Sequence, residues 1–150
     1  MQELISISRS AEVDYNTEAM YELVNDIEAY PDFVHWCNAA SIISKNATSL
    51  TASLSLSAGG VKKTFTTRND MQPGRRIDIN LLEGPFKLLT GYWLFEPLGA
   101  QSCRISIKMN FEFKNKLLRL ALDKIFSHII NTLIETFTER AQKVYGSNRR

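Results

Sequence analysis

The sequence predicts an α+β fold in which one long C-terminal helix covers the buried face of an antiparallel sheet. Between residues 50 and 113, apolar and polar side chains alternate in segments separated by glycine and proline turns, as in strands with one buried face. Residues 115–145 instead repeat their apolar side chains at the helical period. A run of strands followed by a helix, in a chain of 150 residues, is typical of a single layered domain spanning residues 1–150.

The N-terminal segment is predicted to form a strand followed by a short helix. The strand is indicated by the apolar residues Leu4, Ile5, Ile7, Ala11 and Val13. Asn16 is a typical N-cap residue. Apolar side chains then follow at i, i+3, i+4 and i+7, namely Met20, Leu23, Val24 and Ile27. Tyr30-Pro31 is expected to end the helix, because a residue that precedes proline disfavours the α conformation.

About six antiparallel strands are expected between this helix and the C-terminal one. The alternation is clear in five segments, which are residues 50–58, 61–67, 77–81, 89–95 and 103–113. The turns between them are predicted at Gly59-Gly60, Gln72-Pro73-Gly74, Glu83-Gly84-Pro85 and Pro97-Leu98-Gly99. The last strand has a nearly all-polar second face, so one face of the sheet is expected to meet solvent.

The helix predicted for residues 115–145 has an unusually wide apolar face. At about 100° per residue its apolar side chains cover about half of the circumference, whereas a surface helix needs a stripe of only a little over ~100°. These side chains are Leu118, Leu122, Ile125, Phe126, Ile129, Ile130, Leu133, Ile134, Phe137, Ala141 and Val144. The helix therefore either fills a deep groove or covers something besides its own sheet. Residues 146–150 are predicted to form a frayed tail.

The composition is that of an ordinary globular domain and argues against several classes of protein. A net charge of +2 does not by itself indicate a nucleic-acid partner, and no DNA binding is expected. Cys37 and Cys103 are too few for a disulfide framework and lack the spacing of metal ligands, so buried free thiols are expected. No secretory signal is recognised, and no segment reaches the ~18 apolar residues of a membrane span. A cytoplasmic location is therefore predicted.

Four segments of the sequence, in order, carry a specific resemblance. They are residues 30–37 (YPDFVHWC), 63–69 (KTFTTRN), 83–95 (EGPFKLLTGYWLF) and 111–115 (FEFKN). These segments resemble the START-like coenzyme-Q-binding and polyketide cyclase family, with most similarity to its bacterial branch of ribosome association toxins. His35 is one departure, because many relatives have proline at this position.

The resemblance implies a helix-grip fold (START-like, Bet v-type), in which a curved antiparallel sheet wraps around the C-terminal helix and encloses a cavity. This implied fold agrees with the order of elements above. It also explains the wide apolar face, since one part would pack on the sheet and another would face the cavity. The implied ligand is a hydrophobic small molecule, such as a polyprenyl quinone (ubiquinone) or another lipid, and no cofactor is expected.

Apolar residues on two loops and the neighbouring elements are the candidate ligand contacts. Apolar clusters follow prolines at residues 33–36 and 86–89, and such clusters suit a pocket lid, a transient membrane contact or a partner contact. Each of these residues could instead simply fill the core. The candidate ligand-binding residues are Phe33, Val34, Trp36, Phe65, Phe86, Leu89, Trp93, Phe113, Phe126, Ile130 and Leu133.

Candidate catalytic groups are few, and no catalytic residue is assigned. His35 and Cys37 lie two residues apart, but nothing nearby in the sequence orients the histidine as a base. Glu83 could place a polar group at the cavity mouth, but no second carboxylate has a suitable spacing to it. His128 lies on the polar arc of the long helix and is expected to face solvent. No phosphate-binding loop or zinc pattern is present, so no metal site is expected.

Basic residues form a second kind of candidate site. Lys62, Lys63, Arg68 and Lys87 are candidate contacts to the phosphates of ribosomal RNA or anionic lipid. The alternative is that these side chains simply keep the surface solvated.

Three functions follow from these observations. The first is a non-enzymatic carrier or chaperone that binds a polyprenyl quinone or lipid and supports respiration. The second, implied by the resemblance, is a regulator that binds the large ribosomal subunit, blocks subunit association and inhibits translation. The third is an enzyme of the polyketide cyclase or dehydratase type, for which fold alone is weak support.

Overall fold

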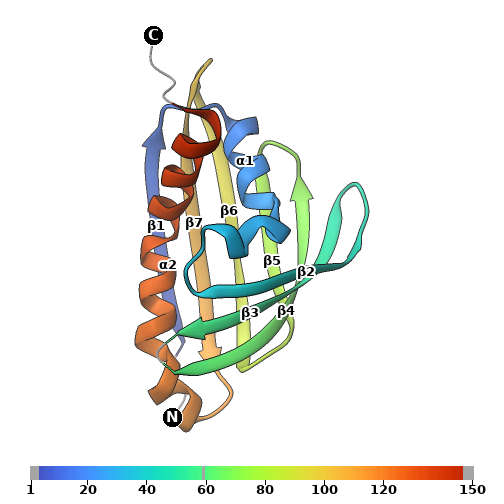
Figure 1. Cartoon of the computed structure of the whole chain (residues 1–150), viewed down its shortest axis with the longest axis vertical. Coiled ribbons are helices and arrows are strands. Elements are labelled where there is room, and N and C mark those ends of the chain that lie inside the picture. Colours follow the sequence, from blue (N-terminus) through green and yellow to red (C-terminus); the bar gives the residue numbers. More distant parts are fainter. Residues whose placement is uncertain (1–3, 59, 147–150) are drawn as a thin grey trace.

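The computed structural model describes residues 4–58 and 60–146, which form one antiparallel sheet packed against helices (Figure 1). In chain order the elements are β1 (Ile5–Val13), α1 (Thr17–Asn25), the 3₁₀ helix η1 (Ile27–Asp32), β2 (Cys37–Lys45), β3 (Ser49–Ala58), β4 (Val61–Gln72), β5 (Arg76–Glu83), β6 (Phe86–Gly99), β7 (Ser102–Phe113) and α2 (Lys116–Tyr145). The seven strands follow the order β1-β7-β6-β5-β4-β3-β2. Strands β2 to β7 therefore pair consecutively, and β1 pairs with β7. The predicted α+β class is confirmed.

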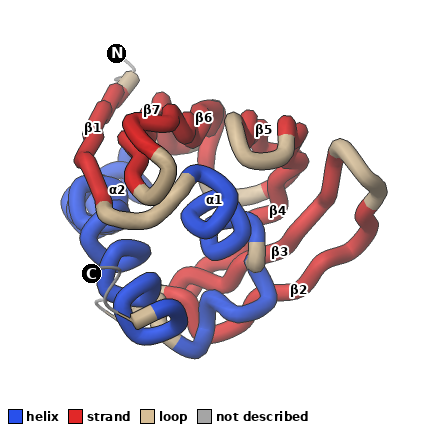
Figure 2. Tube along the Cα trace, turned by 90° about the horizontal axis from the view of Figure 1, so that it is seen from above, coloured by secondary structure: helices blue, strands red, loops and turns tan. Residues whose placement is uncertain are grey.

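The sheet curves around the helices. Figure 2 shows the strands as an arc, seen from above, with α1, η1 and α2 on its inner side. Helix α2 packs on β1 and β7, α1 contacts α2, β6 and β7, and η1 contacts β2. The hydrophobic core lies between these helices and the concave face of the sheet. This is the gripped helix that the resemblance implied.

Helix α2 begins and ends with specific hydrogen bonds. The Asn115 side chain caps the start, because its Oδ1 accepts a hydrogen bond from the Leu118 N–H at 2.9 Å. At the other end, the Tyr15 hydroxyl donates to the carbonyl of Gly146 at 2.7 Å. Gly146, the first residue of the predicted tail, is thereby tied to the segment that follows β1. Residues 147–150 lie outside the described residues.

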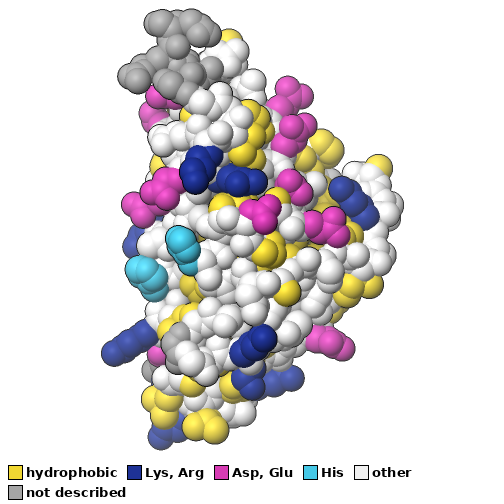
Figure 3. All heavy atoms as spheres, in the orientation of Figure 1, with side chains coloured by type: hydrophobic (Ala, Val, Ile, Leu, Met, Phe, Trp, Pro, Cys, Tyr) yellow, Lys and Arg dark blue, Asp and Glu magenta, His cyan; other side chains and the backbone are white. Residues whose placement is uncertain are grey.

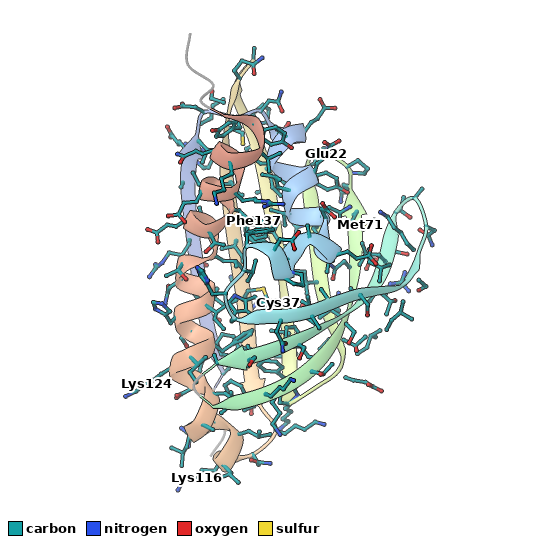
Figure 4. The ribbon with its side chains drawn as sticks, viewed as in Figure 1. Glu22, Cys37, Met71, Lys116, Lys124 and Phe137 are labelled. Carbon is teal, nitrogen blue, oxygen red and sulfur yellow. The ribbon has the colours of Figure 1, made fainter. Side chains whose placement is uncertain are left out.

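The wide apolar face of α2 is largely buried, and Phe137 joins it to two other elements. Its ring lies edge-on to those of Tyr30, Phe33 and Trp93, with centroids 5.4 Å away in each case. Figure 4 shows Phe137 directed from α2 into the protein interior. Val144 is the exception on this face, because 49% of it is exposed. The buried residues of α2 are Leu122, Phe126, Ile129, Ile130, Ile134, Phe137 and Ala141.

Two prolines that the sequence predicts between elements of secondary structure lie inside an element instead. Helix α1 ends at Asn25, and Tyr30-Pro31 lies within η1 instead of ending the first helix. A short 3₁₀ helix tolerates proline because few hydrogen bonds depend on its missing N–H. Strand β6 likewise continues through Pro97 to Gly99. The pairing with β7 shifts register between these two residues, and such an irregularity is where a strand accepts proline.

Strand β2 has no clear alternation in the sequence. Its pairing with β3 shifts register twice, which breaks the period-two pattern that would have revealed it.

The predicted turn after β4 is confirmed, because the Arg75 N–H donates to the Gln72 carbonyl at 2.9 Å. In the predicted β3–β4 turn, Gly60 has a φ of 79°, and Gly59 lies outside the described residues.

Candidate ligand cavity

An inner cavity of about 80 Å³ lies between α2 and the concave face of the sheet. Its walls come from η1, from the strands β3 to β7 and from α2, so it is enclosed by the elements that grip the helix. Seven of the candidate ligand-binding residues line it, namely Trp36, Phe65, Leu89, Trp93, Phe126, Ile130 and Leu133.

Thr67 and Asn69 place polar atoms in this mainly aromatic and aliphatic wall. They occupy successive inward positions of β4, between the buried residues Phe65 and Met71, and are only 3% and 6% exposed. The Thr67 hydroxyl donates to Asn69 Oδ1 at 3.0 Å. The Asn69 Nδ2 has no hydrogen-bond partner among the described residues. An amide donor is therefore free to bond with whatever occupies the cavity.

An outer groove of about 490 Å³ lies on the other side of the cavity wall. It runs between α2 and the end of the β3–β4 hairpin, and its walls are mostly apolar. Both histidines of the chain line it, His35 from the loop after η1 and His128 from α2, together with Lys124. Figure 3 shows the two histidines beside each other, and Figure 4 shows Lys124 on the outer side of α2. The predicted exposure of His128 is confirmed.

Trp36 and Ile129 separate the inner cavity from the outer groove, because both residues line both spaces. Trp36 comes from the loop before β2, and Ile129 comes from the buried face of α2. The two spaces adjoin at these two side chains. The arrangement therefore suits a ligand that occupies the groove and extends inward past Trp36.

The other candidate ligand-binding residues lie outside the inner cavity. Val34 lines the outer groove. Phe33 packs against Phe137 and lies beneath the guanidinium of Arg140, whose Cζ is 4.7 Å from the ring centroid.

Phe86 and Phe113 form an aromatic cluster near the start of α2. Their rings stack with centroids 5.0 Å apart, and Phe86 also lies 4.9 Å from the ring of Phe126. This cluster leaves only about 10 Å³ of free space. Phe86 and Phe113 therefore pack one end of the core.

Exposed lysines gather at the same end of the molecule, where β4, β6 and α2 begin. Two pairs bring these strand ends together, Thr66 with Glu83 and Phe86 with Phe113. Figure 4 shows Lys116 at this tip. We call this surface the basic end, defined by Lys62, Lys63, Lys87, Lys114 and Lys116.

Two of the candidate polar residues, Glu83 and Arg68, lie outside both the cavity walls and the basic end. Glu83 lies at the end of β5 near the basic end and is exposed, outside the walls of the inner cavity and the outer groove. Arg68 lies further along β4, where its Nε is 3.2 Å from the Asp70 carboxylate. The structure thus brings Lys62, Lys63 and Lys87 together but leaves Arg68 outside that surface.

The two cysteines are buried free thiols, as predicted. Burial raises the pKa of the Cys103 thiol to about 11, and it also raises the pKa of the Cys37 thiol. The Cys37 thiol donates to the Ala39 carbonyl at 3.3 Å. Protonated thiols are poor nucleophiles, so this environment does not activate Cys37.

Within residues 4–58 and 60–146, no group of three or more His, Cys, Asp or Glu side chains could hold a metal ion. No helix in the same residues is long and apolar enough to cross a membrane.

The sequence contains a signal for the polar pair in the inner cavity, namely the period-two alternation along β4. The alternation that makes Phe65 and Thr67 inward residues continues to Asn69 and Met71, so Asn69 could have been assigned to the concave face. No comparable signal links His35 to His128. They share the groove only because the fold brings the loop after η1 against α2.

Comparisons with known proteins found a matching family model and several relatives. The family model described as "Polyketide cyclase / dehydrase and lipid transport" matches residues 13–138. The ribosome association toxin RatA of Escherichia coli (strain K12) is 43% identical over 141 residues, which cover 94% of this chain and 89% of that protein. A mitochondrial coenzyme Q-binding protein of Xenopus laevis, COQ10 homolog B, is 25% identical over 146 residues, which cover 95% of this chain and 60% of that protein.

A solved structure supports the fold. The ZhuI aromatase/cyclase of Streptomyces sp. R1128 matches with a TM-score of 0.84 and 16% identity, covering 94% of this chain and 95% of that one. At this identity the likeness concerns the arrangement of the sheet and α2, and it carries no conclusion about chemistry.

Proposed function

This chain belongs to the family of polyketide cyclases, dehydrases and lipid transport proteins, and on that premise we propose that it associates with the ribosome. The 43% identity to the ribosome association toxin RatA, spread over nearly the whole of both chains, carries this proposal. A shared fold alone would not, because one fold serves many functions. The expected partner is the large ribosomal subunit, and the expected consequence is a block of subunit association that inhibits translation.

The basic end is the surface best suited to ribosomal RNA. Its five lysines are exposed and come from β4, from β6, from the link between β7 and α2 and from the start of α2, while the whole chain has a net charge of only +2. Contacts between such side chains and phosphates release counterions and supply most sequence-independent affinity for nucleic acid. Because these lysines lie on one surface, the electrostatic field of the protein is strongest there, and it would orient the protein as it approaches the ribosome.

Reversing the charge of three lysines in the basic end is expected to weaken ribosome binding. The variant carries Lys62→Glu, Lys63→Glu and Lys116→Glu. We expect its affinity for large subunits to fall by about tenfold or more at low salt, and the slope of log affinity against log salt to become shallower. Cosedimentation with purified subunits in sucrose gradients, at several salt concentrations, measures both quantities.

Lys143→Glu is the matched control, because Lys143 is an exposed lysine in the last turn of the same helix. It should leave cosedimentation unchanged. Failure of the unaltered protein to cosediment at low salt would refute ribosome association. Equal binding by all variants would exclude the basic end as the contact surface. Binding of the basic end to anionic vesicles but not to ribosomes would contradict the proposal in favour of a lipid surface.

We propose a second function, the binding of a hydrophobic small molecule, because the inner cavity and outer groove provide a place for one. The groove has a volume typical of ligand sites, which range over roughly 300–1,000 Å³. Transfer of apolar ligand surface from water into these walls would contribute about 25 cal/mol per Å². A polyprenyl quinone such as ubiquinone, or another lipid, fits this chemistry, and the name of the Xenopus laevis relative supports a quinone. In this role the protein would act as a carrier that supports respiration.

Native mass spectrometry tests this second function. Protein purified from its own host without detergent should show a mass increment that disappears under denaturing conditions. Extraction should then yield a quinone or lipid. The proposal fails if no such molecule co-purifies and if added decylubiquinone does not raise the melting temperature.

We propose that both functions proceed without catalysis. The buried, protonated thiols and the exposed, separate position of Glu83 support this proposal. Turnover of a polyketide substrate that is lost on changing Glu83 or His35 would contradict it.

A further inference from the structure

The polar pair Thr67 and Asn69 is unusual for the core position that it occupies. The inward positions on either side along β4 hold Phe65 and Met71, and the facing elements contribute Phe126, Ile129 and Ile130. An apolar side chain at position 69 would fit these surroundings without burying an unpaired donor. Burying an amide donor without a partner is unfavourable, and most buried polar groups in proteins are hydrogen-bonded. Asn69 Nδ2 is not one of the fully enclosed unpaired side-chain atoms of the described residues, so it borders the free space of the cavity, where a bound group can accept its hydrogen bond.

Thr67 determines which atom Asn69 presents to that partner. Because the Thr67 hydroxyl donates to Asn69 Oδ1 at 3.0 Å, the amide oxygen is already engaged and Nδ2 is the free group. The complement of a free N–H is an acceptor oxygen. A charged carboxylate would be poorly solvated in this apolar cavity, whereas a neutral carbonyl oxygen loses less on leaving water. The chemistry thus favours a carbonyl group, as found in ketones, acyl chains and quinones.

We propose that Asn69, oriented by Thr67, selects the ligand by donating a hydrogen bond to its carbonyl oxygen. This inference rests on the hydrophobic ligand binding proposed above and adds the orientation of the ligand. The inner cavity of about 80 Å³ has room for a small polar group, and the outer groove of about 490 Å³ has room for the longer apolar part. The carbonyl end lies innermost, and the apolar chain passes between Trp36 and Ile129 into the groove.

A pair of isosteric probes tests the hydrogen bond. The first is 2-undecanone, and the second is 2-methyl-1-undecene, in which a methylene group replaces the carbonyl oxygen. We expect the unaltered protein to bind the ketone about tenfold more tightly than the alkene, as one net hydrogen bond to a buried donor would give. In Asn69→Leu, which keeps the approximate side-chain shape, the ketone should lose this advantage while the alkene binds as well as before. Competition with a fluorescent fatty-acid analogue measures both affinities.

Asn80→Leu is the matched control. Asn80 makes the same kind of bond on the exposed face of the sheet, because its Oδ1 accepts from the Thr90 hydroxyl at 3.1 Å. Removing it should leave the preference for the ketone intact. If Asn69→Leu does not fold, the ¹⁵N-labelled side-chain amide of Asn69 in the unaltered protein gives the answer, since its resonance should shift with the ketone and not with the alkene.

The outcomes separate this inference from the function on which it rests. Binding of both probes with equal affinity, together with an unshifted Asn69 amide, would overturn the role of Asn69 and leave hydrophobic ligand binding intact. Binding of neither probe, and of no other lipid, would overturn both. A ketone preference that survives Asn69→Leu would place the hydrogen bond elsewhere and would also overturn the inference.

Discussion

Replacing Phe137 by alanine is expected to lower the free energy of unfolding by about 3–5 kcal/mol, the range for removal of a fully buried aromatic ring. The ring is 0% exposed and contacts Tyr30 and Phe33 on the η1 side and Trp93 on β6. Its loss leaves a cavity at the point where three elements meet. In a chain of this size the melting temperature should fall by about 10 °C. Denaturant unfolding followed by circular dichroism measures the change.

Two comparisons make this result specific. Leu120→Ala removes a large apolar side chain from the same helix where 66% of it is exposed, so stability should change by no more than about 0.5 kcal/mol. Phe137→Leu retains most of the buried volume and should cost clearly less than Phe137→Ala. Equal stability of Phe137→Ala and Leu120→Ala would contradict the central position of this ring.

Phe137 also illustrates why much of the fold could be predicted from the sequence. Its place on the buried face of α2 follows from helical periodicity alone, as do those of Phe126 and Ile130. The strands with strict alternation, such as β7, were equally clear. Strand β2 was not, because two register shifts in its pairing with β3 disturb the period that reveals a strand. Proline signals also misled, since Pro31 and Pro97 occupy a 3₁₀ helix and a register shift, where a missing N–H is tolerated.

The candidate site could be predicted only in part, for a related physical reason. Periodicity assigns a residue to the inward face but does not say whether that face meets a cavity or another side chain. Phe126 and Phe113 are both inward, yet Phe126 lines the inner cavity and Phe113 stacks on Phe86. The meeting of His35 and His128 depends on a contact between distant segments that local patterns do not encode.

Gly91 is an inward position of β6 where the strands come too close for any side chain. It pairs with Ile79 of β5 and with Met109 of β7, two residues that line the inner cavity. A Cβ atom at position 91 would lie 2.1 Å from the backbone oxygen of Lys108 and 2.5 Å from the sulfur of Met109. A glycine within a strand commonly marks such a close approach of another backbone. The close pairing of β6 with β7 at the cavity wall therefore depends on the missing side chain.

Gly91→Ala is accordingly expected to destabilise the protein by about 3 kcal/mol or more, since the backbone of β7 must move away. The sign of the change in the free energy of unfolding is informative, because Gly→Ala at an unstrained position usually stabilises a protein by about 0.4–1 kcal/mol. Gly99→Ala in the same strand is the control, because a Cβ atom there would meet only the Ser102 side-chain oxygen at 3.2 Å, which can rotate away. Denaturant unfolding of both variants gives the comparison. Unfolding of Gly91→Ala at the denaturant midpoint of the unaltered protein would show that β7 yields at little cost. The close packing of β6 on β7 would then not be what sets the cavity wall.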